Sequence, residues 1–200
     1  EDLRGKTVYS SGQGATPEYA VNYILSENGM EPGTDVTIEY KADHSELAAS
    51  ILSGDANIAV LPEPFVTQVT TKDPNVKVAL NLTDEWDKDA GDKSALTMGC
   101  LAVRKDFVEQ NKEAFDAFLE EYKASVDFTN SHVEEAAELS EKYDIMPAAV
   151  AAKAIPNCNI VYMDGDEMKQ KMPDFLNILY TANPKSVGGE LPGEDFYYTK

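Results

Sequence analysis

The chain of 200 residues is long enough to bury a hydrophobic core without metal ions or a disulfide scaffold, and too short for a large multidomain assembly. Its 17 basic and 36 acidic side chains give a formal charge of −19, which a phosphate backbone would repel, so we expect no nucleic-acid partner. A hydrophobic share of 42% and an aromatic share of 9% are typical of a folded protein rather than of a charged coil.

Strand and helix signals alternate between residues 7 and 82, which predicts an α/β layer with a largely parallel sheet. The first strand is predicted at Thr7–Tyr9. The first helix is expected to begin with Thr16 as its side-chain cap and Pro17 in its first turn, and to end at Gly29. Its predicted buried residues are Ala20, Val21, Ile24 and Leu25.

The second strand is predicted at Val36–Tyr40, and a second helix follows it. Asp43 and Glu46 have the spacing of a capping box that opens this helix, and Gly54 closes it. The short apolar run at 58–61 predicts a third strand, buried on both faces. The predicted buried residues of the second helix are Leu47, Ala48, Ile51 and Leu52.

The rest of the chain is predicted to change character near residue 90. A helix should follow Pro64, and Val76–Leu82 predicts a fourth strand. The charged residues 84–89 with Gly91 predict an exposed connection and a boundary. The later sequence is predicted to be largely helical, with a capping box of Ser131 and Glu134, a helix start at Pro147 and a kink or break at Pro173. Two apolar stripes are expected on these helices, one of Phe115, Phe118, Leu119, Tyr122 and Val126 and one of Met168, Met172, Phe175, Leu176 and Leu179.

The strongest candidate for ligand binding is the turn between the first strand and the first helix. Gly12 and Gly14 permit a tight turn, and the helix start presents N–H groups that favour an anion. An ordinary strand-to-helix loop explains the same residues, because their spacing is neither a dinucleotide-binding nor a Walker motif. The candidate ligand residues in this turn are Ser10, Ser11, Gly12, Gln13, Gly14, Ala15 and Thr16.

Further ligand candidates follow the second and third predicted strands. Glu63 and Pro64 lie where open α/β sheets bind ligands, outside the carboxyl ends of the strands. A tight proline turn with a solvated carboxylate is the alternative, and the sequence does not decide between them. His44 would lie on the same edge, where a surface histidine beside the capping Asp43 is the favoured explanation.

Catalytic and metal-binding arrangements are missing from the sequence. The histidines are His44 and His132, and no Gly-x-Ser-x-Gly motif is present, so a nucleophilic triad is not expected. Two isolated histidines and the distant Cys100 and Cys158 form no recognisable metal-ligand set. We therefore expect no enzyme, no cofactor and no metal. The two cysteines are either thiols or one bridge.

Four motifs occur in a distinctive order: DLRGKTV at 2–8, GQGATPEY at 12–19, VLPEPF at 60–65 and GCLAVRKDF at 99–107. In this order they resemble the substrate-binding proteins of bacterial ABC importers, especially the branch that binds sulfonate, taurine, nitrate and thiamine pyrimidine precursors. The resemblance continues at 158–162 and 183–189. It therefore extends over nearly the whole chain.

The resemblance implies a type II periplasmic-binding-protein-like fold, in which two α/β lobes close on a solute. Residues 1–95 would form the second lobe. Residues 96–200 would supply a crossing strand and helices that pack on the first lobe, most of which this chain lacks. Surface left uncovered in this way leads us to expect a dimer.

The resemblance also implies a function and a location. The chain would bind a small anionic or zwitterionic solute and deliver it to a membrane permease, outside the cytoplasm and held by a lipid anchor. Oxidising surroundings would favour a bridge between Cys100 and Cys158. Two alternatives stay open: a pyrimidine-precursor-synthesising enzyme of the same fold, for which no pair of catalytic His and cofactor Lys is identifiable, and the effector-sensing domain of a transcription regulator.

Overall fold

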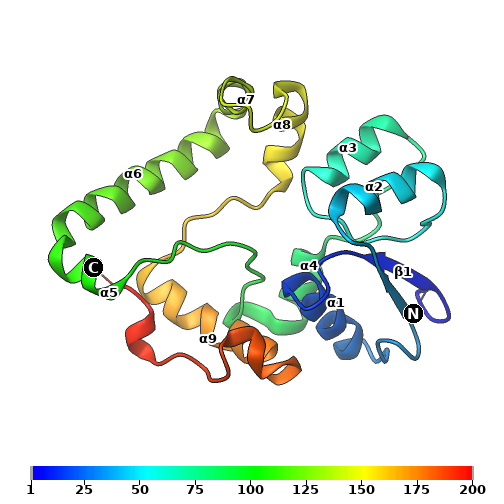
Figure 1. Ribbon diagram of the computed structural model, residues 1–200, viewed down its shortest axis with the longest axis horizontal. Helices are drawn as coiled ribbons and strands as arrows, with labels where there is room; N and C mark the ends of the chain where they lie inside the picture. The colour runs from blue at the N-terminus through cyan, green and yellow to red at the C-terminus, as the bar shows by residue number, and fades with distance from the viewer. Residues whose placement is uncertain (1, 200) are drawn as a thin grey trace. The chain divides into compact units, whose positions relative to one another are not determined.

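The structure, a computed structural model, describes residues 2–199 and contains two compact units (Figure 1). The first unit comprises the residues up to Met98 together with Gly165–Tyr198, and the second comprises Gly99–Asp164 with Thr199. The strands and α-helices of the first unit are β1 (Thr7–Ser10), α1 (Thr16–Glu27), β2 (Thr37–Tyr40), α2 (His44–Ser53), α3 (Phe65–Lys72), α4 (Leu82–Ala90) and α9 (Gly165–Ala182). The helices of the second unit are α5 (Lys105–Gln110), α6 (Lys112–Ser131), α7 (Val133–Lys142) and α8 (Ala148–Ala154).

The sheet of the first unit is parallel, as predicted, and confirms the α/β class. Strands β1 and β2 pair in register from Thr7 opposite Thr37 to Ser10 opposite Tyr40. The third predicted strand, at 58–61, is reduced to one parallel bridge, in which the Tyr9 N–H donates to Ile58 and the Tyr9 carbonyl accepts from Val60, both at 2.8 Å. Its residues are half-buried, so the prediction of burial on both faces is wrong.

Helix α1 begins where the sequence predicts, and the residues predicted to form its buried face are buried. Ala20, Val21, Ile24 and Leu25 are buried, together with Tyr19. The predicted cap is wrong, because Ala15 rather than Thr16 occupies the N-cap position and no side chain caps this end. The fixed backbone angle of Pro17 in the first turn is the start signal that remains. One face of α1 joins the two strands in a core cluster of Val8, Val21, Leu25, Met30 and Val36.

Helix α2 confirms the predicted capping box. The Asp43 carboxylate accepts the Glu46 N–H at 2.8 Å, and the Glu46 carboxylate accepts the Ala42 N–H at 2.9 Å. Gly54 ends the helix with a left-handed backbone, φ +83°, which glycine adopts without strain. Leu52 was predicted inside but is 38% exposed, because it lies on the side of the helix away from buried Leu47.

Residues 76–91 depart from the sequence prediction. The described chain forms no strand at Val76–Leu82, and the charged stretch that follows is helix α4 rather than an exposed connection. Asn81 caps α4 by accepting the Thr83 N–H at 2.9 Å. Trp86 is fully buried, with its ring centroid 4.8 Å from that of Tyr23 and 5.8 Å from that of Phe175. Burial of one large aromatic ring thus decides the structure of a segment whose other residues are mostly charged or small.

Helix α9 returns to the first unit, where Phe175 and Leu179 share a core cluster with Trp86. Pro173 lies inside α9 without dividing it, so the prediction of a break is wrong. The predicted division at residues 1–95 and 96–200 stays a prediction. In this structure, however, α9 packs with α1 and α4 inside the first unit.

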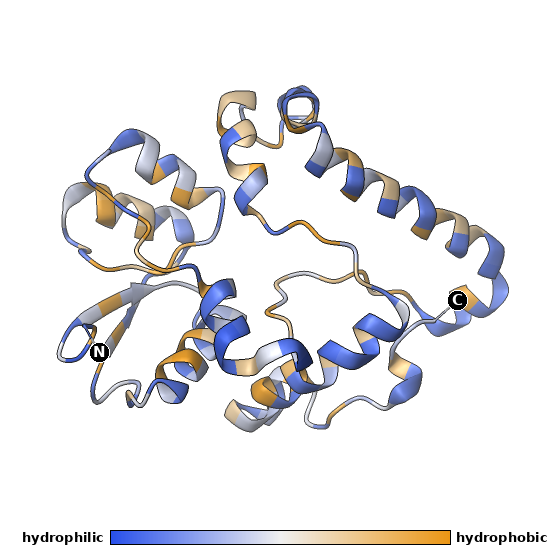
Figure 2. Cartoon of the chain, turned by 180° about the vertical axis from the view of Figure 1, so that it is seen from behind, coloured by the Kyte–Doolittle hydropathy of each residue, from blue (hydrophilic) through white to orange (hydrophobic). Residues whose placement is uncertain are grey.

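The second unit is helical, as predicted. Along α6, Phe115, Leu119 and Val126 are buried, whereas Phe118 and Tyr122 of the same stripe remain well exposed. Figure 2 shows hydrophilic and hydrophobic residues alternating along this long helix.

Two local predictions for the second unit have different outcomes. The predicted capping box at Ser131 and Glu134 is wrong, because the Ser131 hydroxyl donates back to the Asp127 carbonyl of its own helix at 2.6 Å, and α7 begins after His132 without a side-chain cap. Pro147 does precede α8, as predicted. Across residues 2–199, no helix combines the length and the apolar character that a membrane span needs.

Candidate functional site

The loop after β1 is a tight turn that brings buried hydroxyls next to exposed backbone. Ser10 and Ser11 are both buried, whereas Gln13, Gly14 and Ala15 are exposed. Gly12 and Gly14 have φ of +76° and +77°, which favours glycine at both positions. A Cβ at Gly12 would also lie 3.3 Å from the Pro17 ring. The predicted turn geometry is therefore confirmed.

Ser11 is tied to the first residue of α2. Its Oγ lies 2.5 Å from the His44 Nδ1. The His44 ring in turn lies 5.4 Å from the ring of Phe65, the first residue of α3. Beside them, the Ser10 carbonyl accepts the Lys41 N–H at 2.9 Å. The structure thus brings together three of the segments that the sequence singled out, at the carboxyl ends of β1 and β2.

Glu63 lies near this cluster but has a local role. Its carboxylate accepts the Thr67 N–H at 3.1 Å, which stabilises the start of α3. The peptide bond between Glu63 and Pro64 is cis. Both residues are half-buried, and the turn that they form places Phe65 against His44. The carboxylate is therefore bonded within the turn rather than solvated, and ligand binding by Glu63 and Pro64 stays a prediction.

Two residues outside the predicted ligand set contact the loop. The Glu18 carboxylate accepts the Gly14 N–H at 2.5 Å, and the Tyr19 hydroxyl donates to the Gly14 carbonyl at 3.3 Å. Tyr40, the last residue of β2, lies beside Glu18. Burial of the phenol, and then the charge and hydrogen bond of Glu18, raise the pKa of Tyr40 to about 12. The spacing of Gly14 and Glu18 across the first turn of α1 is the signal that could have revealed this contact.

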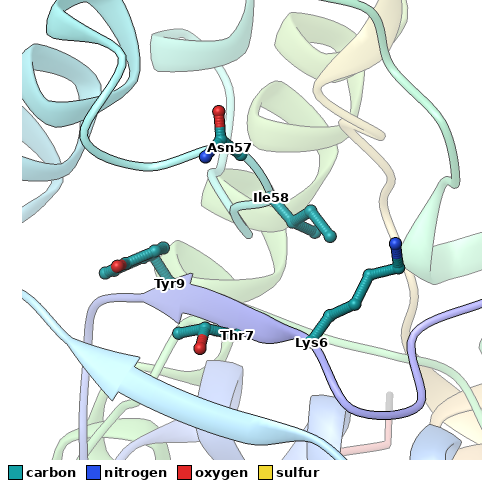
Figure 3. A pocket seen from close by; sticks show the side chains of 5 residues that line it. All are labelled: Lys6, Thr7, Tyr9, Asn57 and Ile58. Atoms are coloured by element: carbon teal, nitrogen blue, oxygen red, sulfur yellow. The ribbon is translucent and has the colours of Figure 1, made fainter.

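A pocket of about 380 Å³ lies beside β1, apart from the predicted ligand loop (Figure 3). Lys6, Thr7 and Tyr9 line it from β1 and the residue before it, and Asn57 and Ile58 line it from the segment that bridges to Tyr9. None of the residues predicted to bind a ligand lines this pocket.

The two cysteines, which the sequence also singled out, lie in the second unit. Cys100 is exposed and Cys158 half-buried, and no disulfide joins them. The expected bridge therefore has no support in this structure. Within residues 2–199, no three His, Cys, Asp or Glu side chains gather as a metal-ligand set.

Comparisons with known proteins give a consistent result. The model of the family described as "ABC transporter, phosphonate, periplasmic substrate-binding protein" matches residues 1–155. A solved structure of an ABC transporter from Parabacteroides distasonis matches with a TM-score of 0.79 and 25% sequence identity over 97% of this chain. The chain spans 66% of the length of that solved chain. No curated protein matches the sequence. The predicted periplasmic-binding-protein-like fold is thereby confirmed.

Proposed function

The chain belongs to the family of periplasmic, phosphonate-type substrate-binding proteins of ABC transporters, and from this membership we propose that it captures a small solute outside the cytoplasm for import through a membrane permease. The family consists of binding proteins rather than enzymes. The observation that carries the proposal is the hydrogen bond between Ser11 and His44, because it joins the loop after β1 to the helix after β2 at the sheet edge where α/β folds bind ligands.

The proposed solute site is the surface around this pair. Gly12, Gln13, Gly14, Ala15 and Thr16 would face the solute from the loop, with the buried Ser10 and Ser11 behind them, and His44, Glu63 and Pro64 would face it from the neighbouring turns. Hydroxyl, imidazole and backbone N–H groups hydrogen-bond oxyanions well. The net charge of −19 does not oppose this, since binding would depend on groups within hydrogen-bond distance.

The proposed solute is a small anion or zwitterion. The family description favours a phosphonate. The branch that binds sulfonate, taurine, nitrate and thiamine pyrimidine precursors remains the finer alternative, on the motifs at 12–19 and 60–65. Phosphonate and sulfonate groups share tetrahedral oxygens, so one set of hydrogen-bond donors suits both.

Delivery would use closure of two lobes on the solute. A solute that contacts both lobes favours the closed state by its higher affinity for that state, and the closed form would then dock on the permease. A lipid anchor would keep the protein at the membrane. The family's periplasmic description supports an extracytoplasmic location.

Dimerisation is a separate prediction. It is supported by the exposed aromatic rings of Phe118 and Tyr122 in the second unit. Light scattering that finds only monomers would refute it.

A thermal-shift screen tests the proposed function. The protein is heated with methylphosphonate, 2-aminoethylphosphonate, taurine, nitrate or a pyrimidine, and a solute that binds only the folded state raises the melting temperature. We expect one class to raise it, and Ser11→Ala and His44→Gln to weaken that response. His132→Gln, which lies in the second unit, is the matched control and should respond as the wild type does. A panel without any stabilising compound would contradict the proposal.

A further inference from the structure

The Gly14 amide, in the exposed part of the proposed loop, already has an anionic partner. The Glu18 carboxylate accepts this N–H at 2.5 Å from one turn further along the chain. Gly14 is exposed and Glu18 half-buried, so the pair lies at the surface of the loop rather than in the core. The chain's own carboxylate therefore stands where an acidic group of a solute would bind.

Tyr40, at the end of β2, lies beside Glu18. Burial of the phenol, and then the charge and hydrogen-bonding influence of Glu18, raise the pKa of Tyr40 to about 12, so the half-buried phenol is uncharged at neutral pH and adds no charge next to the carboxylate. The donor that the carboxylate accepts is the Gly14 N–H.

The charge of Glu18 is not neutralised by a basic side chain. Within residues 2–199, no lysine or arginine forms an ion pair with it. The nearby Lys41 extends over the ring of Tyr9 instead, with its ammonium 5.7 Å from the ring centroid. The carboxylate therefore presents a negative charge to whatever approaches the loop.

We infer that Glu18 is a specificity-determining residue: its carboxylate occupies the Gly14 amide as a built-in anion, so the loop disfavours dianions and favours solutes that turn an ammonium or hydroxyl group toward Glu18. The inference rests on the proposed function, because it takes the Ser10–Thr16 loop as part of the solute site. Like charges at hydrogen-bond distance repel, and a dianion meets twice the repulsion of a monoanion. An ammonium group would instead gain a charge-assisted hydrogen bond. The acidic end of a zwitterion would then be left to the other N–H groups of the loop and to His44.

Sulfate tests the inference directly, because it is a dianion at neutral pH and needs no knowledge of the natural solute. The ¹⁵N-labelled protein is titrated with sodium sulfate at constant ionic strength, and the Gly14 amide signal is followed by NMR. Glu18→Ala frees the amide and removes the charge. Glu18→Gln keeps an acceptor for the amide but removes the charge, so it separates the two effects and serves if the alanine variant folds poorly. Glu27→Gln removes the same charge from the exposed far end of α1 and is the matched control.

We expect the dissociation constant for sulfate at Gly14 to be at least about tenfold lower in Glu18→Ala than in the wild type. In Glu18→Gln it should fall by less. In Glu27→Gln it should equal the wild-type value. Equal sulfate affinity in the wild type and Glu18→Ala, or a gain in Glu27→Gln equal to that in Glu18→Ala, would overturn the inference.

A second measurement separates this inference from the proposed function. The affinities for methylphosphonate and 2-aminoethylphosphonate are compared by calorimetry, and their ratio should shift at least tenfold toward methylphosphonate in Glu18→Gln. An unchanged ratio with both compounds binding refutes the role of Glu18. If neither compound binds while the sulfate result holds, the proposed solute class fails and the role of Glu18 stands.

Discussion

The Nδ1 of His44 lies 2.5 Å from the Oγ of Ser11, and this contact connects the start of α2 to the loop after β1. Ser11 is buried, so its hydroxyl has little access to water as a substitute partner. The first unit therefore depends on this contact for the position of the loop as well as for part of its stability.

Replacing Ser11 by alanine removes this hydrogen bond. We expect the free energy of unfolding to fall by about 1 kcal/mol, the usual net value of such a bond. Urea unfolding followed by circular dichroism measures the change. Gln13→Ala, an exposed position in the same loop, is the control and should change stability little. An equal loss in both variants would mean that the contact contributes nothing specific.

Replacing Asp43 by alanine removes the cap of α2. Its carboxylate accepts the Glu46 N–H at 2.8 Å, and loss of such a cap costs about 1 kcal/mol. Asp43→Asn keeps an acceptor of the same shape and should retain most of the stability. If the asparagine variant loses as much as the alanine variant in the same urea experiment, the negative charge rather than the hydrogen bond stabilises the helix.

Replacing Trp86 by alanine should have a large effect. The ring is fully buried between Tyr23 and Phe175, so its removal leaves a cavity, and truncation of a buried aromatic costs about 3–5 kcal/mol. Circular dichroism during urea unfolding measures it. Val78→Ala, at an exposed position nearby in sequence, should cost far less. A small loss in Trp86→Ala would contradict the burial of α4.

Tyr40 predicts a dependence of stability on alkaline pH. Its folded-state pKa, about 12, is higher than the unfolded value near 10, so the folded state holds this proton more tightly. Its contribution is therefore fully present below pH 10 and is lost as the pH rises toward 12. Unfolding midpoints measured across this range should fall less steeply in Tyr40→Phe.

Glu18→Gln should lower the pKa of Tyr40, because the charge of Glu18 helps to raise it. Tyrosinate absorbance is titrated in the wild type and in Glu18→Gln, and in each of them with Tyr40→Phe added. Subtracting the curve with Tyr40→Phe from the curve without it isolates Tyr40 among the ten tyrosines. An unchanged Tyr40 titration in Glu18→Gln would show that burial alone raises the pKa.

The two cysteines should differ in reactivity. Cys100 is exposed and Cys158 half-buried, so a thiol reagent should modify Cys100 first in the native, unreduced protein. Mass spectrometry after limited labelling identifies the modified residue. Absence of labelling in both, reversed by a reductant, would establish the bridge that the family resemblance leads us to expect.

The parts of the fold that were predictable are marked by local sequence signals at the ends of helices. Pro17 marks the start of α1, and Asp43 and Gly54 mark the two ends of α2 through short-range hydrogen bonds and backbone preferences. The helix around Trp86 was not predictable in this way. Its neighbours are mainly acidic, and the residues that bury it, Tyr23 and Phe175, lie far away in the sequence.

The candidate site was predictable to a similar extent. Ser11 and His44 follow predicted strands, so their meeting at one sheet edge could be anticipated. Glu18 and Tyr40 could not be paired from sequence, because their contact depends on how α1 packs beside the end of β2. The role of Glu63 was undecided for a related reason, since its bond to Thr67 requires the turn to be in place.

The burial of Trp86 also determines what optical spectroscopy can detect. It is the only tryptophan of the chain, and it belongs to the first unit, with its Nε1 3.3 Å from the Ser94 hydroxyl. Tryptophan emission therefore reports the unfolding of the first unit and does not report the unfolding of α6, α7 and α8. A mismatch between an emission transition and a helix-ellipticity transition would measure how independently the two units unfold.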